Sequence, residues 1–390
     1  MFRELRGVQL RWPIGIVVVL AIITGGALAY APYLPQLVVE GVPPLVGPGA
    51  GHFADLQGAE APRDLHPTPD ARDRVLLPDL ATAFESKHGK ALLLFRDGEL
   101  VLEHYAEGLG PQTRFNSFSM AKSLVGALVY KALAEGKLRS LDQTLGELLP
   151  LDTGIKTVTI RDLLQMRSGI AFDTEGGKFG GLSSAGKEAD TAPNPFGPLA
   201  RLHFLGLAAI ERGLTVAPGD THDFSYQNVN TALLGEVLET VYGRPLAELV
   251  DDKLWRPAGA ASGLWREAAA NAPVSAYCCV YATARDWIRV GLFLSENGGA
   301  TPFLPTPLWR EFLGLDVPVA DRHKTHYGTH IWQDVLDRPG QALQGPFTYL
   351  MGQGGQTLYL MPDKGVVVYR AGDDIQLLHS TLYGAWNSLG

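Results

Sequence analysis

Two segments with the pattern of a β-hairpin lie far apart in the chain, and together they limit the folds that it can adopt. In residues 91–108, ALLLFRDGELVLEHYAEG, two apolar runs flank the turn sequence RDGE of Arg96–Glu99, and an Asp-Gly pair in such a place is a strong hairpin signal. Residues 356–372, QTLYLMPDKGVVVYRAG, have the same pattern around a turn at Pro362–Gly365. We expect the two hairpins to share one antiparallel sheet.

Helical patterns surround and separate the two hairpins. We expect helices within residues 76–89, 138–150, 157–170, 229–243 and 376–389. Strands near both ends with helices between them fit a sheet that is flanked by helices and carries a mostly helical domain. The predicted fold class is therefore α+β, an α/β sandwich. The long polar, glycine-rich segment Phe172–Pro198 is expected to be a loop that lines a pocket.

The N-terminus has the pattern of a membrane segment. Arg3, Arg6 and Arg11 precede a run without any charged residue from Trp12 to Val39, and about 20 apolar residues suffice to cross a bilayer. Residues 1–34 are expected to form a transmembrane anchor or a signal segment, because Ala27–Ala29 also resembles a signal-peptidase site. We favour an inner-membrane anchor with the rest of the chain in the periplasm, or a secreted protein if the segment is cleaved.

The composition of the remaining chain divides it into two parts and excludes several partners. Residues 35–72 are rich in Pro, Gly and Ala and are expected to be a linker with little regular structure, followed by one catalytic domain over residues 73–390. A net charge of −8 argues against a nucleic-acid partner. The adjacent Cys278 and Cys279 are expected to be buried thiols, and neither they nor His326 and His330 have the pattern of a metal site.

The first candidate catalytic motif is Ser119-x-x-Lys122, in the stretch RFNSFSMAKSLVGALVYKAL. Its residues lie on one face at the start of a long apolar helix, where burial would lower the pKa of the lysine and let it act as a base. A polar helix start with a solvent-reaching lysine explains the motif equally well. A second match, Ser184 and Lys187, lies in the long polar loop and is expected to be chance.

Two further motifs could complete such a site. Tyr226-Gln227-Asn228 comes directly before a helix, where it could supply a phenol and an amide, or simply cap the helix. A nearby lysine ammonium would favour the phenolate of Tyr226. The run Gly352–Gln356 (GQGGQ) leads into a strand, where glycines let a substrate approach the backbone and where the Gln356 N–H could bind an oxyanion; a plain turn is the alternative.

In this order, the three motifs resemble those of the class C β-lactamase-related serine hydrolases, a group that includes penicillin-binding-like esterases and 6-aminohexanoate-dimer hydrolases. The phrases TIRDLLQMRSGI, PGDTHDFSYQN, YATARDWIRVGLFL and GQGGQTLYLMPDKGVVV also match, so the resemblance extends from about Ala91 to the C-terminus. It is closest to the 6-aminohexanoate-hydrolase branch.

The resemblance implies roles for the motif residues. Ser119 would be the acylated nucleophile, Lys122 its activating partner and Tyr226 the proton shuttle, while Asn228 would hold the lysine or the substrate carbonyl. Gln353, Gly354, Gly355 and Gln356 would bind the substrate and its oxyanion. No cofactor is implied. The chain departs from the pattern where β-lactamases carry Lys-Thr-Gly, because Gln353-Gly354-Gly355 stands there, and in Cys278-Cys279, which replaces a Gly-Gly pair.

The sequence therefore predicts a serine hydrolase that acts through an acyl-enzyme on a small ester or amide. A D-Ala-D-Ala-type peptidase or a β-lactamase is one alternative, although Gln353 supplies no cation for a substrate carboxylate. A sensor that binds ligand without turnover is the other.

Overall fold

The computed structural model describes residues 25–151, 154–172, 195–219, 222–322 and 326–389. Its largest sheet has seven strands in the order β3-β2-β11-β10-β9-β8-β7, all pairs antiparallel. The strands are β2 (Gly89–Arg96), β3 (Glu99–Tyr105), β7 (His326–Gly328), β8 (Ile331–Leu336), β9 (Gly345–Gly352), β10 (Gln356–Met361) and β11 (Val366–Gly372). The first hairpin pairs with the last one through β2 and β11, which confirms the shared sheet.

Both hairpin turns lie where the sequence places them. Asp97 and Gly98 have φ of 53° and 88° between β2 and β3, and positive φ at both residues is what a two-residue hairpin loop requires. A short 3-10 turn at Pro362–Lys364, closed by Gly365 with φ 60°, joins β10 to β11. The residues of the two turns thus set the register within each hairpin, β2 with β3 and β10 with β11.

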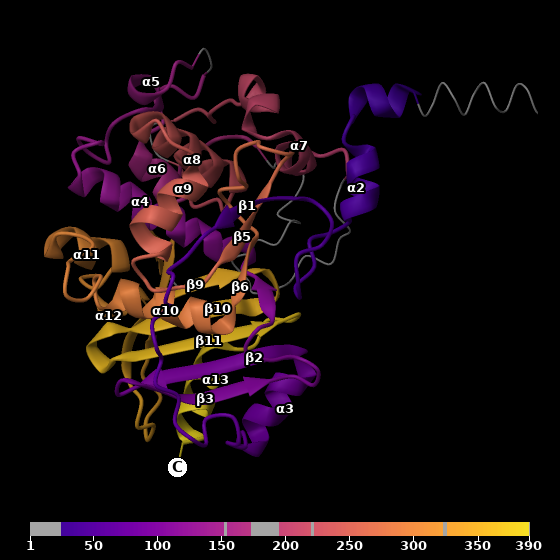
Figure 1. Cartoon of the computed structure of the whole chain (residues 1–390). Coiled ribbons are helices and arrows are strands. Elements are labelled where there is room, and N and C mark those ends of the chain that lie inside the picture. The colour runs from indigo at the N-terminus through magenta and orange to yellow at the C-terminus, as the bar shows by residue number, and fades with distance from the viewer. Residues whose placement is uncertain (1–24, 152–153, 173–194, 220–221, 323–325, 390) are drawn as a thin grey trace, which may run out of the picture.

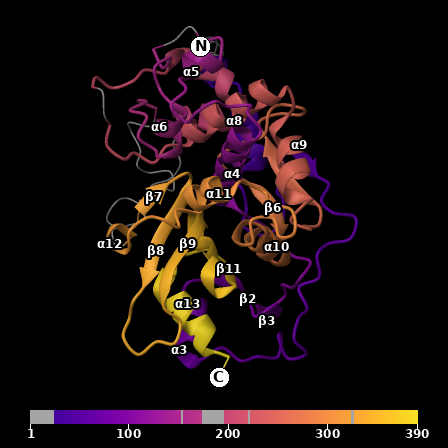
Figure 2. The ribbon, with the colours of Figure 1, turned by 90° about the vertical axis from the view of Figure 1, so that its left-hand side faces the viewer.

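The seven-stranded sheet is covered by helices on both faces (Figures 1 and 2). Alternate residues of a strand point to opposite faces, so Leu92 and Leu94 pack with α3 (Pro78–Ser86) and α13 (Leu378–Asn387). Leu93 and Phe95 belong instead to the larger core, which contains α10 (Ala284–Ser295). The sheet is therefore the middle layer of an α/β sandwich, which confirms the predicted mixed fold with antiparallel strands.

A mostly helical part lies above the sheet in Figure 1 and contributes to the same larger core. The helix α4 at its centre is buried along almost its whole length and contacts α8, α9 and α11. The helices of this part and its surroundings are α4 (Ala121–Ala134), α5 (Leu145–Leu148), α6 (Ile160–Leu164), α7 (Pro198–Leu205), α8 (Asn228–Tyr242), α9 (Leu246–Val250), α11 (Thr306–Leu313) and α12 (Val319–Arg322).

A second, four-stranded sheet involves the segment that the sequence suggested to be a linker. Its order is β1-β5-β6-β4, with β1 (His52–Leu56), β4 (Arg114–Asn116), β5 (Gly263–Glu267) and β6 (Val280–Thr283). Because β1 pairs with β5 over five residues, and α2 (Leu34–Glu40) precedes it, the expectation of little regular structure in residues 35–72 is wrong. The polar groups of this segment find partners in the body of the protein.

The predicted membrane segment lies mostly outside the described residues, which begin at residue 25. Residues 25–30 are helical and are followed by α2. Within the part of the chain that the structure describes, no helix is both long and apolar enough to span a bilayer. The long loop Phe172–Pro198 is likewise described only at its two ends.

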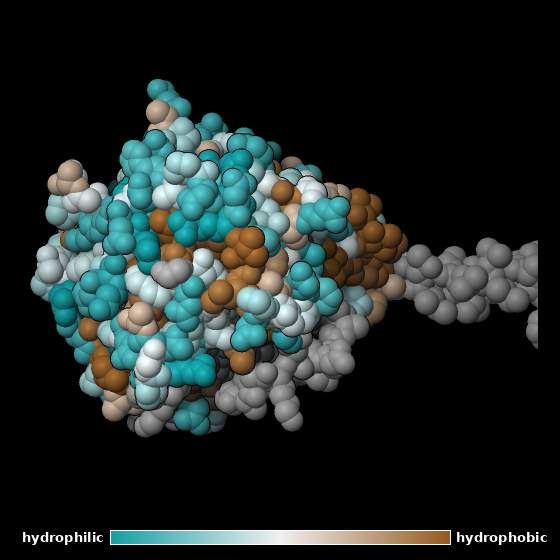
Figure 3. Space-filling view, turned by 90° about the horizontal axis from the view of Figure 1, so that it is seen from below, coloured by the Kyte–Doolittle hydropathy of each residue, from teal (hydrophilic) through white to brown (hydrophobic). Residues whose placement is uncertain are grey.

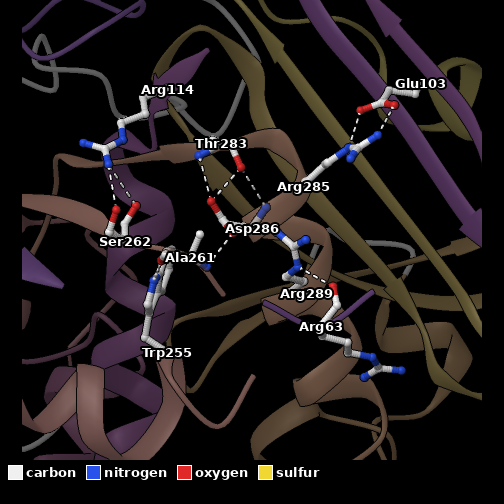
Figure 4. A network of polar contacts seen from close by, with 10 residues as sticks. All are labelled: Arg63, Glu103, Arg114, Trp255, Ala261, Ser262, Thr283, Arg285, Asp286 and Arg289. Carbon is white, nitrogen blue, oxygen red and sulfur yellow. Dashed lines mark hydrogen bonds and ion pairs between the residues drawn. The ribbon is translucent and has the colours of Figure 1, made fainter. Parts of the chain in front are cut away.

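A polar network fastens α10 to its surroundings (Figure 4). Thr283 and Asp286 form a capping box at the start of the helix, in which each side chain bonds to the backbone N–H of the other residue. Arg285 reaches the sheet, where both of its bonds to the Glu103 carboxylate are 2.7 Å long. Because the Glu103 side chain is fully buried on β3, this pair joins helix and sheet inside the protein.

Candidate active site

Ser119 lies in a tight 3-10 turn, Phe118–Met120, between β4 and α4. The residue before it, Phe118, has φ of 43°, a conformation that costs free energy for a residue other than glycine and is often found at functional sites. A hydrogen bond stabilises the turn, because the Phe118 N–H donates to Asn116 Oδ1 at 2.9 Å. Ser119 is thus presented at the entrance of the buried helix, as the sequence predicted.

Lys122 lies one helical turn after Ser119 and contacts three oxygens. Its Nζ is 3.0 Å from Ser119 Oγ, 2.7 Å from Asn228 Oδ1 and 2.9 Å from the Tyr277 carbonyl oxygen. The last two can only accept hydrogen bonds, so they take two N–H groups of the amine. The remaining tetrahedral position of Nζ therefore faces the serine hydroxyl.

Burial determines the charge of this amine. The Lys122 side chain is only 1% exposed, and no carboxylate is among its hydrogen-bond partners in the described residues. Desolvation therefore holds the pKa of Lys122 well below its usual value. A neutral amine has a lone pair in its third position, and that lone pair can accept the Ser119 proton.

Tyr226 is brought to the same place but in a different state from the expected one. A hydrogen bond with Ser119 lowers the pKa of Tyr226, but burial raises it more, and the net shift is upward. Lys122 Nζ lies over the ring of Tyr226, 5.0 Å from the centroid. A cation beside the phenol oxygen would favour the phenolate, but an amine over the face of the ring does not. The expectation of a phenolate is therefore wrong, and Tyr226 is a neutral phenol, stacked on Trp332.

The glycine-rich run reaches the site with its first residues only. A β-carbon on Gly352, the last residue of β9, would overlap the Ser117 carbonyl oxygen and lie 3.1 Å from the Ser119 nitrogen, so this strand end packs directly against the serine turn. Gln353 lines the pocket.

The rest of the run lies elsewhere. Gly354, Gly355 and Gln356 do not line the pocket in the described residues, because the glycines face β11 and the segment after it, and because the Gln356 side chain is bonded to Gly372. The assignment of the oxyanion N–H to Gln356 is not supported by this geometry, and Gln353 is the better placed residue.

The two cysteines lie beside the serine turn and are joined to each other in a disulfide. The expectation of two free thiols is therefore wrong. Neighbouring side chains of an extended strand point apart, but Cys279 has φ of 73°, which takes the backbone out of that alternation. Tyr277, whose carbonyl holds Lys122, directly precedes the pair, so the turn that carries the disulfide also positions the amine.

These residues surround one cavity of about 240 Å³. Besides Ser119 and Tyr226, its wall includes groups that the sequence gave little reason to select: Leu37, Gly41, Val42, Pro43, Phe118, Leu199, Ala200, His203, Phe204 and Tyr277. Most of this wall is apolar. Only the phrase YCCV pointed to any of these residues, because Tyr277 directly precedes the two cysteines that replace the Gly-Gly pair of the family pattern.

Comparisons with known proteins identify the family of this chain. A family model described as Beta-lactamase matches residues 79–371. The 6-aminohexanoate-dimer hydrolase of Paenarthrobacter ureafaciens is 27% identical over 232 residues, which cover 57% of this chain and 56% of that relative. The match thus spans little more than half of the relative's length.

Solved structures have the same fold at lower identity. A Bacillus anthracis protein described as a candidate 6-aminohexanoate-dimer hydrolase has a TM-score of 0.68 and 18% identity, with 92% of each chain covered. A D-stereospecific amidohydrolase from Streptomyces has a TM-score of 0.57 and 19% identity, covering 78% of this chain and 98% of the other. Because the family model matches well more than half of this chain, the chain belongs to the beta-lactamase family.

Proposed function

We propose that this protein is a serine hydrolase that cleaves an ester or amide through an acyl-enzyme on Ser119. The observation that carries the proposal is the setting of Lys122. Two obligate acceptors, Asn228 Oδ1 and the Tyr277 carbonyl, hold its amine so that the third position of Nζ faces Ser119 Oγ at 3.0 Å. A buried, neutral lysine in that position is a general base directed at a nucleophile.

In the acylation step, Ser119 Oγ attacks the substrate carbonyl carbon while Lys122 Nζ takes the hydroxyl proton. The Ser119 and Gln353 N–H groups bind the oxyanion, each contributing about 10²–10³ in rate. The Tyr226 phenol protonates the leaving oxygen or nitrogen as the bond to it breaks. A water molecule then attacks the acyl-enzyme and gives a proton to the Tyr226 oxygen, while the Lys122 ammonium returns its proton to Ser119 Oγ, which releases the acid and restores all three groups.

The relatives support amide cleavage as the reaction, since one is named a 6-aminohexanoate-dimer hydrolase and another a D-stereospecific amidohydrolase. Cleavage of β-lactams or of D-Ala-D-Ala peptides is less well supported. Gln353 lines the pocket where those enzymes use a lysine for the substrate carboxylate, and a neutral amide attracts a carboxylate much less than a cation does.

The test is hydrolysis of p-nitrophenyl acetate by the purified protein. We expect turnover that Ser119→Ala abolishes and that Ser184→Ala, which removes the serine of the other Ser-x-x-Lys match, leaves unchanged. A fluorophosphonate probe should label the wild type and not Ser119→Ala. Labelling without turnover would instead identify a sensor, and nitrocefin hydrolysis faster than ester hydrolysis would identify a β-lactamase.

We also propose that a membrane anchor lies within residues 1–34 and holds the protein in the inner membrane with its catalytic domain in the periplasm. The support is the sequence alone, in which three arginines precede a run without charge from Trp12 to Val39. The full chain should sediment with membranes and resist carbonate extraction, whereas a chain that lacks residues 1–24 should not. Recovery of the full chain in the soluble fraction would contradict the anchor.

A further inference from the structure

The N-terminal helix α2 and the turn after it form one wall of the active-site cavity. Leu37 lies on α2, and Gly41, Val42 and Pro43 follow it; all four line the same cavity as Ser119 and Tyr226. Leu199 and Ala200 of α7 line the cavity too, and Leu37 packs against the hydrophobic cluster that contains Ala200. Part of the wall beside Ser119 therefore comes from a segment that precedes the matched family region by more than 30 residues.

This wall is fastened to the body of the protein by buried contacts. Glu40 at the end of α2 forms an ion pair with Arg266 of β5 at 2.7 Å, and their side chains are only 7% and 3% exposed. Tyr33, just before α2, stacks on Phe204 with ring centroids 5.5 Å apart. Its hydroxyl donates to the Pro195 carbonyl at 2.7 Å. These contacts fix the position of Leu37 and Val42 relative to Ser119.

The chemistry of the cavity is apolar and uncharged. Among the described lining residues there is no Asp, Glu, Lys or Arg, and Lys122 is buried beneath the serine with its amine already bonded. His203 is the one lining residue that could carry charge, but burial, and next the neighbouring Arg266, keep its pKa well below the usual value, so it is neutral. The volume of about 240 Å³ exceeds the roughly 150 Å³ of an apolar cavity that binds benzene.

We propose that the site selects substrates with an uncharged, apolar acyl group of several carbons, and that Leu37 and Val42 are the residues of the α2 wall that select it. This inference rests on the proposed hydrolase function. Each methylene that enters such a cavity gains about 0.8 kcal/mol, which corresponds to about fourfold in kcat/KM. A charged chain end finds no charged partner among the described lining residues and has to be desolvated at a cost.

Three p-nitrophenyl esters test the substrate class, namely acetate, hexanoate and 6-aminohexanoate. We expect kcat/KM for hexanoate to exceed that for acetate by about tenfold or more, and to exceed that for 6-aminohexanoate by about tenfold or more. The last two differ only in a terminal ammonium, so their comparison isolates charge. Equal rates for hexanoate and acetate, or a preference for the charged ester, would overturn the proposal.

Two matched double variants test the wall. Leu37→Ser with Val42→Ser removes two apolar side chains from the cavity, and the ratio of kcat/KM for hexanoate to that for acetate should fall about fivefold or more. Val38→Ser with Val39→Ser removes two from the solvent side of the same helix, where these valines are 83% and 72% exposed, and should leave the ratio unchanged. Figure 3 shows hydrophobic residues gathered on the right-hand side of the molecule, seen from below. An equal fall in both double variants would overturn the role of the wall.

The outcomes separate the two proposals. If Ser119→Ala abolishes turnover of all three esters but chain length and charge have no effect, the hydrolase stands and the acyl selectivity fails. If turnover persists in Ser119→Ala, or the wild type turns over none of the three, both fail.

Discussion

At Lys122, two oxygens that can only accept hydrogen bonds orient the amine toward the hydroxyl oxygen of Ser119. Asn228 Oδ1 and the Tyr277 carbonyl accept from the amine, so that the remaining position of Nζ is directed at Ser119 Oγ. Neither oxygen carries a charge, and the amine is buried, which keeps its pKa low. A carboxylate in either place would satisfy the same hydrogen bond but would keep the lysine protonated and unable to act as a base.

Asn228→Asp tests this account through the pH profile. Lys122 is a base whose pKa is lowered by burial, so kcat/KM falls as pH falls through that pKa and the amine becomes charged. A carboxylate in place of the Asn228 amide, whose oxygen is 2.7 Å from Nζ, should raise the pKa of Lys122 because it favours the charged amine. The acid limb of kcat/KM should therefore move to higher pH, measured with p-nitrophenyl acetate.

The control for this variant is Asn271→Asp, which adds the same charge at an exposed position outside the cavity. It should leave the profile in place. An unchanged acid limb in Asn228→Asp would mean that the limb belongs to a group other than Lys122.

At the level of elements, the site depends on how closely the end of β9 approaches the turn that carries Ser119. Gly352 has an ordinary strand conformation with φ of −124°, so its lack of a side chain matters for space and not for backbone freedom. The atoms that a β-carbon would meet are the Ser117 carbonyl oxygen, the Phe118 β-carbon and the Ser119 nitrogen, none of which can rotate away as the end of a flexible side chain could. Strand and turn therefore hold each other in place.

Gly352→Ala should push the two elements apart. We expect kcat/KM to fall about tenfold or more, because small displacements of catalytic groups are costly, and the free energy of unfolding to fall by about 1–3 kcal/mol. Gly110→Ala is the matched control, since nothing lies within 4 Å of its added carbon. Unfolding by denaturant and ester kinetics measure the two effects, and a fully active Gly352→Ala would contradict this packing.

On the scale of the whole molecule, segments that lie far apart in the sequence pair in one sheet, and the sequence predicted part of this. The hairpin turns and apolar runs are local, so the shared seven-stranded sheet followed from them. Likewise, Ser119 and Lys122 share one helical turn. By contrast, the α2 wall and the Tyr277 carbonyl depend on contacts between distant segments, and no local pattern marks these.

The glycine-rich run shows a finer limit of sequence reasoning. Its residues were predicted to bind the substrate and its oxyanion, but of Gln353, Gly354, Gly355 and Gln356 only Gln353 is among the described residues that line the pocket. Which residue of a strand end faces a site depends on the register of the sheet, and a shift by one residue reverses the face. Gly354, Gly355 and Gln356 face β11 instead. There Arg370 donates a hydrogen bond to the Gly354 carbonyl oxygen, and the Gly372 N–H donates to the Gln356 side chain.

The buried Glu103 links sheet and helix across the molecule and should make stability depend on pH. Burial opposes its ionisation, but hydrogen bonds from Arg285, Arg72 and Tyr105 outweigh that and lower its pKa from 4.5. The stabilisation is therefore present in full above pH 4.5 and is lost as pH falls through the lowered pKa.

Glu103→Gln should lower the free energy of unfolding at pH 7 by about 2 kcal/mol, and the difference from wild type should shrink below pH 4.5. Glu99→Gln, at an exposed position of the same strand, should have no such effect. Urea unfolding of the three proteins at pH 7 and at pH 3.5 measures the differences. A Glu103→Gln difference that is equal at both pH values would contradict the role of the ionised carboxylate.

The most direct test of the account is the mass of the protein during turnover. The wild type, mixed with p-nitrophenyl hexanoate and quenched in acid within the burst, should gain one hexanoyl group, and peptide mapping should find it on Ser119. Lys122→Arg, whose guanidinium cannot give up its proton, should acylate about 10²-fold or more slowly. An acyl group on another residue, or equal acylation in Lys122→Arg, would contradict the claim that a neutral Lys122 activates Ser119.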